Sequence, residues 1–114
     1  MKKLLLLALF PLSSMAANTA VLNWTATTQD DSGATITSPV TYNVYQGVSG
    51  AAKTLTQSGV TATTFTATTG LTGGSTVCWE VSAIAGGVEG PHSAEACKTF
   101  PVAKPLAPTA LTVK

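Results

Sequence analysis

The sequence predicts an all-β fold, a sandwich of about seven strands around one core. Short runs that alternate apolar and polar residues recur along the chain, separated by turns rich in Gly, Pro and Ser. Threonine, whose β-branched side chain suits the outward face of a strand, occurs 20 times in 114 residues. No window has the 3.6-residue apolar period of an amphipathic helix. These features together favour short strands joined by turns.

The first strand is expected at residues 19–27, where Ala20, Leu22 and Trp24 alternate onto one face. A polar loop closed by Pro39 follows it. The remaining strands are expected, in chain order, at residues 40–47, 53–58, 63–69, 76–85 and 92–100. The second of these is short and polar, which is typical of a strand at the edge of a sheet.

Residues 1–16 have the layout of a secretory signal peptide. A basic end and a short apolar run precede a small-residue cleavage site, Ser14-Met15-Ala16. The apolar run is shorter than the roughly 20 residues that span a bilayer as a helix. We therefore expect a secreted protein, outside the cell or on its surface. Its domain would occupy residues 17–100, followed by a Pro-rich connector and terminal strand at 101–114.

The chain that remains after the signal peptide carries few charges. It has four lysines, five acidic residues and no arginine. A nucleic-acid partner requires a basic stripe that neutralises phosphates, and an acidic membrane surface requires one as well. We therefore expect no nucleic-acid partner and no membrane association beyond export. A surface rich in Thr and poor in charge is also found on extracellular structural proteins, whose subunits must not repel one another.

Several runs resemble a bacterial-type fibronectin type III domain. The resemblance covers residues 19–100 and is carried, in order, by LNWTA, YNVYQG, TFTA and GLTGGSTVCWEVSAIAGG. It implies an immunoglobulin-like β-sandwich in which Trp24 lies on the family's second strand. The family usually has a Tyr where this chain has Val77, so the hydrogen bond of that corner is not expected. The family's first strand has no counterpart before Ala20.

Cys78 and Cys97 are predicted to form a disulfide. They fall on the last two expected strands, and a hairpin centred on Gly87-Val88 pairs residues whose numbers sum to 175, as these two do. Directly opposite residues of antiparallel strands are close enough for a disulfide, and export supplies an oxidising compartment. Because alternation sends Trp79 into the core, the bridge is expected on the outer face of the sheet. A metal or redox role is disfavoured, since no cluster of further ligands accompanies the two cysteines.

No catalytic constellation is recognisable, so we expect a non-enzyme that has neither cofactor nor metal. His92, the one histidine of the sequence, falls in the loop before the last strand. Asp30 and Asp31 could contribute to a calcium site, but calcium takes six or more oxygens, and a polar turn is the favoured interpretation. The remaining acidic residues are expected to be scattered and solvated: Glu80, Glu89 and Glu95.

The C-terminal segment resembles the strand that is missing at the front. It follows the pattern P-x-x-P-x-x-L-x-V of the first strand of fibronectin type III domains, and the residues concerned are Pro105, Leu106, Pro108, Leu111 and Val113. The resemblance implies that Leu111 and Val113 face a core lined by Ala20, Leu22 and Trp24. The connector 101–104 spans at most about 14 Å, which is too short for a return to the far end of its own domain.

Three interpretations of this segment remain open. It could complete the next subunit, complete its own domain, or stay unpaired. The leading hypothesis is a secreted, non-enzymatic subunit that polymerises head-to-tail into a filament or surface appendage by strand donation. The alternative is a monomeric binding, adhesion or virion-decoration module that recognises a glycan or protein with its loops 28–39 and 86–92.

Overall fold

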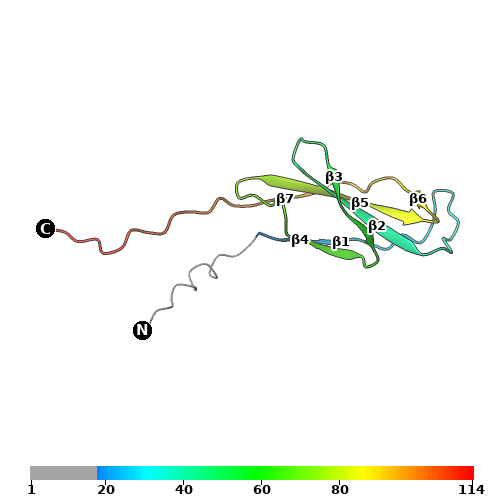
Figure 1. Cartoon of the computed structure of the whole chain (residues 1–114), viewed down its shortest axis with the longest axis horizontal. Coiled ribbons are helices and arrows are strands. Elements are labelled where there is room, and N and C mark those ends of the chain that lie inside the picture. The colour runs from blue at the N-terminus through cyan, green and yellow to red at the C-terminus, as the bar shows by residue number, and fades with distance from the viewer. Residues whose placement is uncertain (1–17) are drawn as a thin grey trace, which may run out of the picture.

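The computed structural model describes residues 18–114, so the predicted signal peptide lies outside the described residues. Every regular element in the described part is a strand, and seven strands form two sheets (Figure 1). The predicted all-β fold is therefore confirmed. Residues 18–114 include no helix long and apolar enough to cross a bilayer.

The larger sheet has β5 (Thr76–Ala85) between two groups of strands. On one side lie β2 (Val40–Val48) and the edge strand β3 (Thr54–Val60), and on the other lie β6 (Val88–Glu89) and β7 (Ala96–Thr99). The β2–β5 ladder is continuous and antiparallel from Val40 opposite Ala85 to Val48 opposite Val77. This long ladder forms the centre of the larger sheet.

The smaller sheet consists of β1 (Ala20–Asn23) and β4 (Thr64–Ala67). The two strands are antiparallel, and both are shorter than the predicted runs at 19–27 and 63–69. β1 ends early because the chain bends towards the larger sheet, where the Thr27 N–H donates to the Tyr42 hydroxyl at 3.0 Å.

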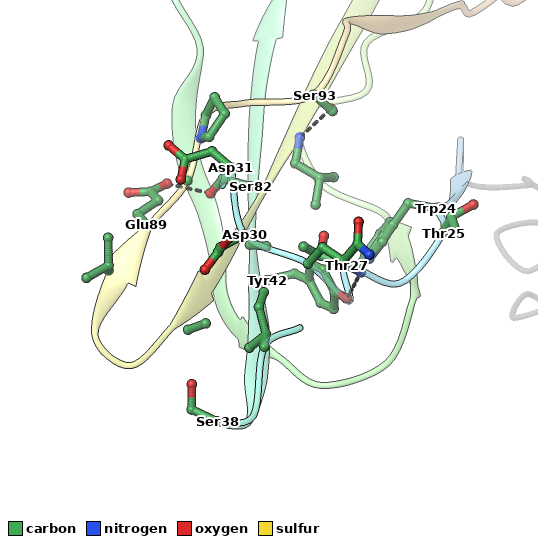
Figure 2. Close-up of a pocket in the computed structure, with 18 of the residues that line it drawn as sticks. Trp24, Thr25, Thr27, Asp30, Asp31, Ser38, Tyr42, Ser82, Glu89 and Ser93 are labelled. Carbon is green, nitrogen blue, oxygen red and sulfur yellow. Dashed lines mark hydrogen bonds between the residues drawn. The ribbon is translucent and has the colours of Figure 1, made fainter. Parts of the chain in front are cut away.

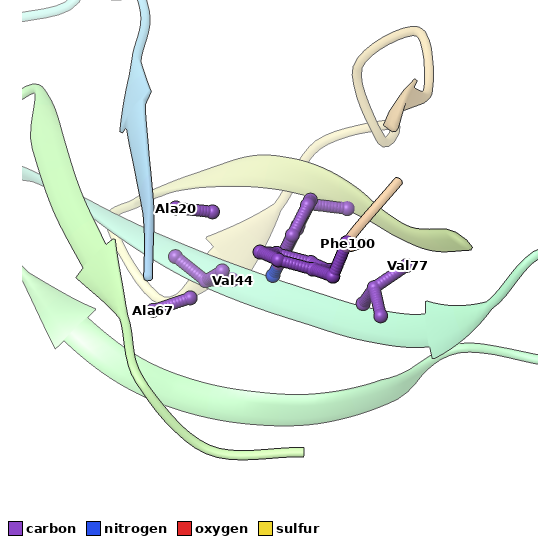
Figure 3. Close-up of a cluster of buried hydrophobic side chains, with 6 residues drawn as sticks. Ala20, Val44, Ala67, Val77 and Phe100 are labelled. Atoms are coloured by element: carbon purple, nitrogen blue, oxygen red, sulfur yellow. The ribbon is translucent and has the colours of Figure 1, made fainter. Parts of the chain in front are cut away.

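The core lies between the two sheets (Figure 3). Ala20 and Ala67 from the smaller sheet pack against Val44, Val77 and Trp79 from the larger one, and Phe100 completes the cluster. Val44 is completely buried. The alternation that the sequence predicts for β2 and β5 thus places the expected residues inside.

The two ends of the sandwich carry different segments (Figure 1). At the end that we call the loop pole, β1 gives way to the loop 24–39, and the turn Gly86-Gly87 follows β5. At the opposite end, the tail pole, β1 and β5 begin and the chain leaves β7 through Phe100. There the Phe100 N–H donates to the Ser75 carbonyl at 2.9 Å. Residues 101–114, which we call the tail, then extend away from the sandwich (Figure 1).

The predicted centre of the last hairpin, Gly87-Val88, is wrong, because the hairpin turns one residue earlier. The turn is Gly86-Gly87, and both residues have positive φ (59° and 80°), as a two-residue type I′ turn requires. Paired residue numbers consequently sum to 173 between β5 and β6 but to 175 between β5 and β7. The two residues that separate these sums lie in segment 90–95, which is outside the ladder. The strand predicted at 92–100 is therefore shorter in the structure, where β7 begins at Ala96. This segment stays attached to β5, because the Ser93 N–H donates to the Val81 carbonyl at 2.8 Å.

Candidate functional site

One edge of β1 has no strand beside it. Among residues 18–114, β1 pairs with β4 alone. The Trp24 N–H donates to the Thr63 carbonyl at 3.0 Å, which continues the ladder towards β4. Hydrogen-bonding direction alternates along an antiparallel strand, so the backbone groups of Val21 and Asn23 face the open edge.

The outer edge of β3 is also unpaired in the described chain, but it is built differently. β3 carries polar side chains, is exposed along nearly its whole length, and its register with β2 shifts twice. Short, polar and irregular edges are those that natural proteins use to prevent unwanted pairing. The open edge of β1 is also short, at four residues, but its register is regular and its inward face is apolar.

Two depressions lie beside this open edge, one near each end of β1, and together we call them the groove. Its larger depression, with a cavity volume of about 810 Å³, lies near the loop pole over Trp24, Tyr42 and Val81 (Figure 2). A smaller depression of about 270 Å³ lies nearer the tail pole, beside Ala20 and Leu22. The three residues predicted to line an acceptor groove, Ala20, Leu22 and Trp24, therefore all lie along it.

The indole N–H of Trp24 is a buried donor that lacks an acceptor. Its Nε1 atom has no hydrogen-bond partner among the described residues. The Trp24 ring packs edge-on against Tyr42, with ring centroids 5.3 Å apart. Trp79, in contrast, donates its Nε1 hydrogen to Gln46 Oε1 at 2.9 Å. An unpaired buried donor costs about 1–3 kcal/mol, so a partner that brings an acceptor to Trp24 would be favoured by a similar amount.

Lys98 occupies the tail-pole end of the groove. It lies opposite Val77 and therefore on the core-facing side of β7. Its ammonium group donates to the Thr19 carbonyl at 3.0 Å and lies 5.4 Å from the centroid of the Phe100 ring. The sequence analysis did not single out Lys98. The signal was present, because Lys98 and Phe100 share one face of an alternating strand.

The tail presents its apolar side chains to solvent. Leu106, Leu111 and Val113 are 93%, 92% and 94% exposed. The described tail contains no strand, and its backbone bends at Ala110, which has a φ of 59°. It does not fold back into the groove of its own domain (Figure 1). This open arrangement differs from the interpretation in which the tail completes its own domain.

The predicted disulfide between Cys78 and Cys97 is confirmed. The two residues lie directly opposite each other in the β5–β7 ladder, and their sulfurs are 2.08 Å apart. The bridge lies on the face opposite the core, but only Cys97 is exposed there. Cys78 is completely buried, because it is paired with Gly47 and the Ala52 backbone lies directly over Gly47.

The acidic residues near the last hairpin form a connected cluster, so the prediction that they are scattered is wrong. Glu80 accepts a hydrogen bond from His92 Nδ1 at 2.9 Å and pairs with Lys53 at 3.3 Å. Lys53 also pairs with Glu95, while Glu89 accepts from the Tyr45 and Ser82 hydroxyls. The His92 ring stacks on Tyr45 with centroids 4.2 Å apart.

This cluster attaches segment 90–95 to the outer face of the larger sheet. The hydrogen bond from His92, followed by the contact with Lys53, lowers the pKa of Glu80. The hydroxyl of Ser82 and then that of Tyr45 lower the pKa of Glu89. The same segment forms one wall of the larger depression through Gly90, Pro91 and Ser93. The cluster therefore fixes the position of a groove wall.

Asp30 organises the opposite wall. Its Oδ1 atom accepts hydrogen bonds from the Ser32 N–H, the Ser32 hydroxyl and the Ala34 N–H, at 2.9, 2.6 and 3.0 Å. These bonds, that from the Ser32 hydroxyl above all, lower the pKa of Asp30. A side chain that bonds to the backbone two and four residues ahead stabilises a turn. This geometry agrees with the polar turn that was favoured over a calcium site.

The two packed antiparallel sheets, with the last hairpin closing the larger one, define an immunoglobulin-like β-sandwich. Among solved structures, the chain is similar to the crystal structure of an Fn3-like protein from Clostridium thermocellum. The TM-score is 0.56 and the sequence identity 32%, over 77% of this chain and 82% of that chain. The chain therefore belongs to the fibronectin type III-like family, as the sequence resemblance indicated. No protein-family model matches it, and no curated protein does.

Proposed function

We propose that this protein is a non-enzymatic, secreted structural subunit that assembles head-to-tail into an extracellular filament or surface appendage. Each subunit would insert its tail into the groove along β1 of the next subunit. One observation carries the proposal: the same chain combines an unpaired strand edge beside a groove with an apolar tail that makes no use of its own groove.

The exposed tail residues supply a driving force of suitable size. Burial of a Leu or Val side chain contributes roughly 1.5–3 kcal/mol. Three such residues, Leu106, Leu111 and Val113, would contribute roughly 5–9 kcal/mol before the costs of association are subtracted. Backbone hydrogen bonds to Val21 and Asn23 would be added to this, as in other cases of strand addition.

The position of the tail favours donation to another subunit. The tail leaves at the tail pole and points away from the groove of its own domain (Figure 1). A contact between the tail of one copy and the groove of another joins two different surfaces. Such a heterologous contact continues from copy to copy unless it happens to close into a ring. The low charge of the chain reduces repulsion between the subunits.

Secretion is supported by the predicted signal peptide and by the disulfide, since disulfides persist in oxidising compartments. A binding module for a glycan or protein is a second candidate. It is favoured by the position of the larger depression, whose walls come from the loop 25–38 and from residues 88–93. In that case the depression itself would hold the ligand, and the tail would have no role in it.

The test compares the secreted chain with two full-length variants, Leu111→Asp and Thr112→Asp. Both add one charge to the tail, but only the first places it on the face that carries Leu111 and Val113. Light scattering and negative-stain electron microscopy should show filaments for the wild type and for Thr112→Asp, and monomers for Leu111→Asp. A wild-type chain that stays monomeric at high concentration would refute the assembly and leave the binding module.

A further inference from the structure

We infer that the donated tail docks antiparallel to β1, enters the groove at the loop pole, and lies with Leu111 opposite Trp24 and Val113 opposite Leu22. This inference rests on the proposed function and specifies the direction and register of the contact. Three features of the groove lead to it: the direction of the tail, the position of Lys98, and the unpaired indole of Trp24.

The direction follows from where the tail leaves the domain. β1 runs from the tail pole to the loop pole. A tail that continues along the long axis of its own subunit meets the loop pole of a neighbour placed in the same orientation, and it then runs antiparallel to β1. If the tail instead entered at the neighbour's tail pole, the tail poles of the two subunits would face each other, and each subunit would insert its tail into the groove of the other. Such a reciprocal pair is closed, whereas antiparallel docking propagates.

The hydrogen-bonding pattern of β1 restricts which tail residues can face the core. Val21 and Asn23 offer their backbone groups to the open edge, and their side chains point outward. Directly opposite residues in a ladder share a face. An inward Leu111 must therefore lie opposite an inward residue of β1 or its extension, that is, Ala20, Leu22 or Trp24.

Lys98 decides between the remaining registers. If Leu111 lay opposite Leu22, Lys114 would lie opposite Thr19, whose carbonyl already holds the Lys98 ammonium group at 3.0 Å. The Lys114 backbone N–H would then compete with the Lys98 ammonium group for that carbonyl oxygen. With Leu111 opposite Ala20, the Thr112 N–H would compete for the same oxygen. With Leu111 opposite Trp24, Lys114 lies opposite Val21 and avoids Lys98. A register in which Leu111 lies beyond Trp24, nearer the loop pole, would place no tail residue opposite Leu22 and would leave the depression beside Leu22 empty.

The chosen register also suits the shapes of the two depressions. The larger side chain, Leu111, enters the depression of about 810 Å³ beside Trp24 and Tyr42. The smaller Val113 enters the depression of about 270 Å³ beside Leu22. With Leu111 opposite Trp24, the tail residues beside the indole are Ala110 and Leu111, so a backbone carbonyl of this part of the tail is a suitable acceptor for the Trp24 indole N–H.

A photo-cross-linking experiment tests direction and register in full-length protein. Benzoylphenylalanine replaces Ala107 in one variant and Thr112 in another, because neither residue is expected to fill the groove. Filaments of each are irradiated, and the cross-linked peptides are sequenced by tandem mass spectrometry. We expect the probe at 107 to label the loop 25–38 and the probe at 112 to label Asn23 of a second subunit.

The outcomes separate this inference from the proposed function. Labelling at the loop pole by 112 and at the tail pole by 107 would overturn the direction, while filament assembly by the tail would stand. Labelling of Val21 instead of Asn23 by 112 would overturn the register alone. Filaments whose probes label no groove residue would overturn both proposals. A closed dimer in place of filaments would refute antiparallel docking.

The indole contact has its own test in the variant Trp24→Phe, with Trp79→Phe as the matched control. Trp24→Phe removes a donor that has no acceptor in the free subunit. The midpoint of urea unfolding should therefore fall only by the amount that corresponds to the smaller apolar area of the Phe ring. The critical concentration for assembly should nevertheless rise about tenfold. Trp79→Phe should lower the unfolding midpoint, since it leaves the Gln46 Oε1 atom without its donor. An unchanged critical concentration in Trp24→Phe would refute the indole contact.

Discussion

Removal of the Cys78–Cys97 disulfide should destabilise the domain by about 3 kcal/mol. The bridge joins residues 19 apart in sequence. In the chain-entropy model, a loop of this size raises the free energy of the unfolded state by about 3 kcal/mol. All four residues of β7 are exposed, and apart from the bridge the strand is held by its ladder with β5, by the hydrogen bond from Lys98 to Thr19 and by the buried Phe100 that follows it.

The measurement is urea unfolding of the variant Cys78→Ala/Cys97→Ala at a concentration where the protein is monomeric. With a slope of about 1 kcal/mol per molar urea for so small a domain, the midpoint should fall by about 3 M. Wild-type protein in reducing agent should behave similarly, which separates the cross-link from the loss of sulfur packing. A fall of less than about 1 M in both samples would refute the entropic reasoning.

A matched control lies two residue pairs along the same ladder. Thr76 and Thr99 are also opposite each other, and their hydroxyls are 2.7 Å apart. The variant Thr76→Ala/Thr99→Ala removes a cross-strand pair that is not covalent, so it should cost only about 0.2–1 kcal/mol. If it cost as much as the loss of the disulfide, local ladder contacts would explain both results.

Three further predictions concern the folded domain. Val44→Ala should cost about 2–3 kcal/mol in urea unfolding, because Val44 is completely buried between the sheets. Gly47→Ala should be destabilising by about 1–3 kcal/mol, because its Cβ would lie 2.7 Å from the Ala52 carbonyl oxygen. The melting temperature should fall as the pH drops below about 4.5, the ordinary pKa of Glu80. A carboxyl whose pKa is lowered in the folded state stabilises that state above its unfolded pKa and loses this contribution on protonation. His92→Ala should reduce the slope of this acid loss, and an unchanged slope would contradict the assigned cause.

Much of the fold could be predicted because it depends on local alternation. The side chains of β5 switch faces at every residue, so the position of Val77 and Trp79 on the core face follows from the pattern alone. The shortness of β1 could not be predicted in this way. It depends on a hydrogen bond between Thr27 and Tyr42, which lie on different elements.

The groove was harder to predict than the residues that line it. Ala20, Leu22 and Trp24 follow from strand period, but Lys98 matters only because β7 lies across the gap from Thr19. The contact between His92 and Glu80 forms because segment 90–95 leaves the ladder, and no residue type in that segment predicts this departure. Contacts between elements thus set the details that local patterns leave open.

The change of register between β6 and β7 has a consequence for loop length. The predicted turn was one residue late, yet Cys78 and Cys97 still meet, because segment 90–95 shifts the register by two residues, from a sum of 173 to one of 175. An even shift preserves which way each side chain faces, and an odd shift reverses it. Deletion or insertion of one residue here would turn Cys97 towards the core and Lys98 towards solvent. Variation in the register set by this loop is therefore constrained twice: a shift by one residue reverses the faces, and a shift by two keeps the faces but moves Cys97 away from Cys78.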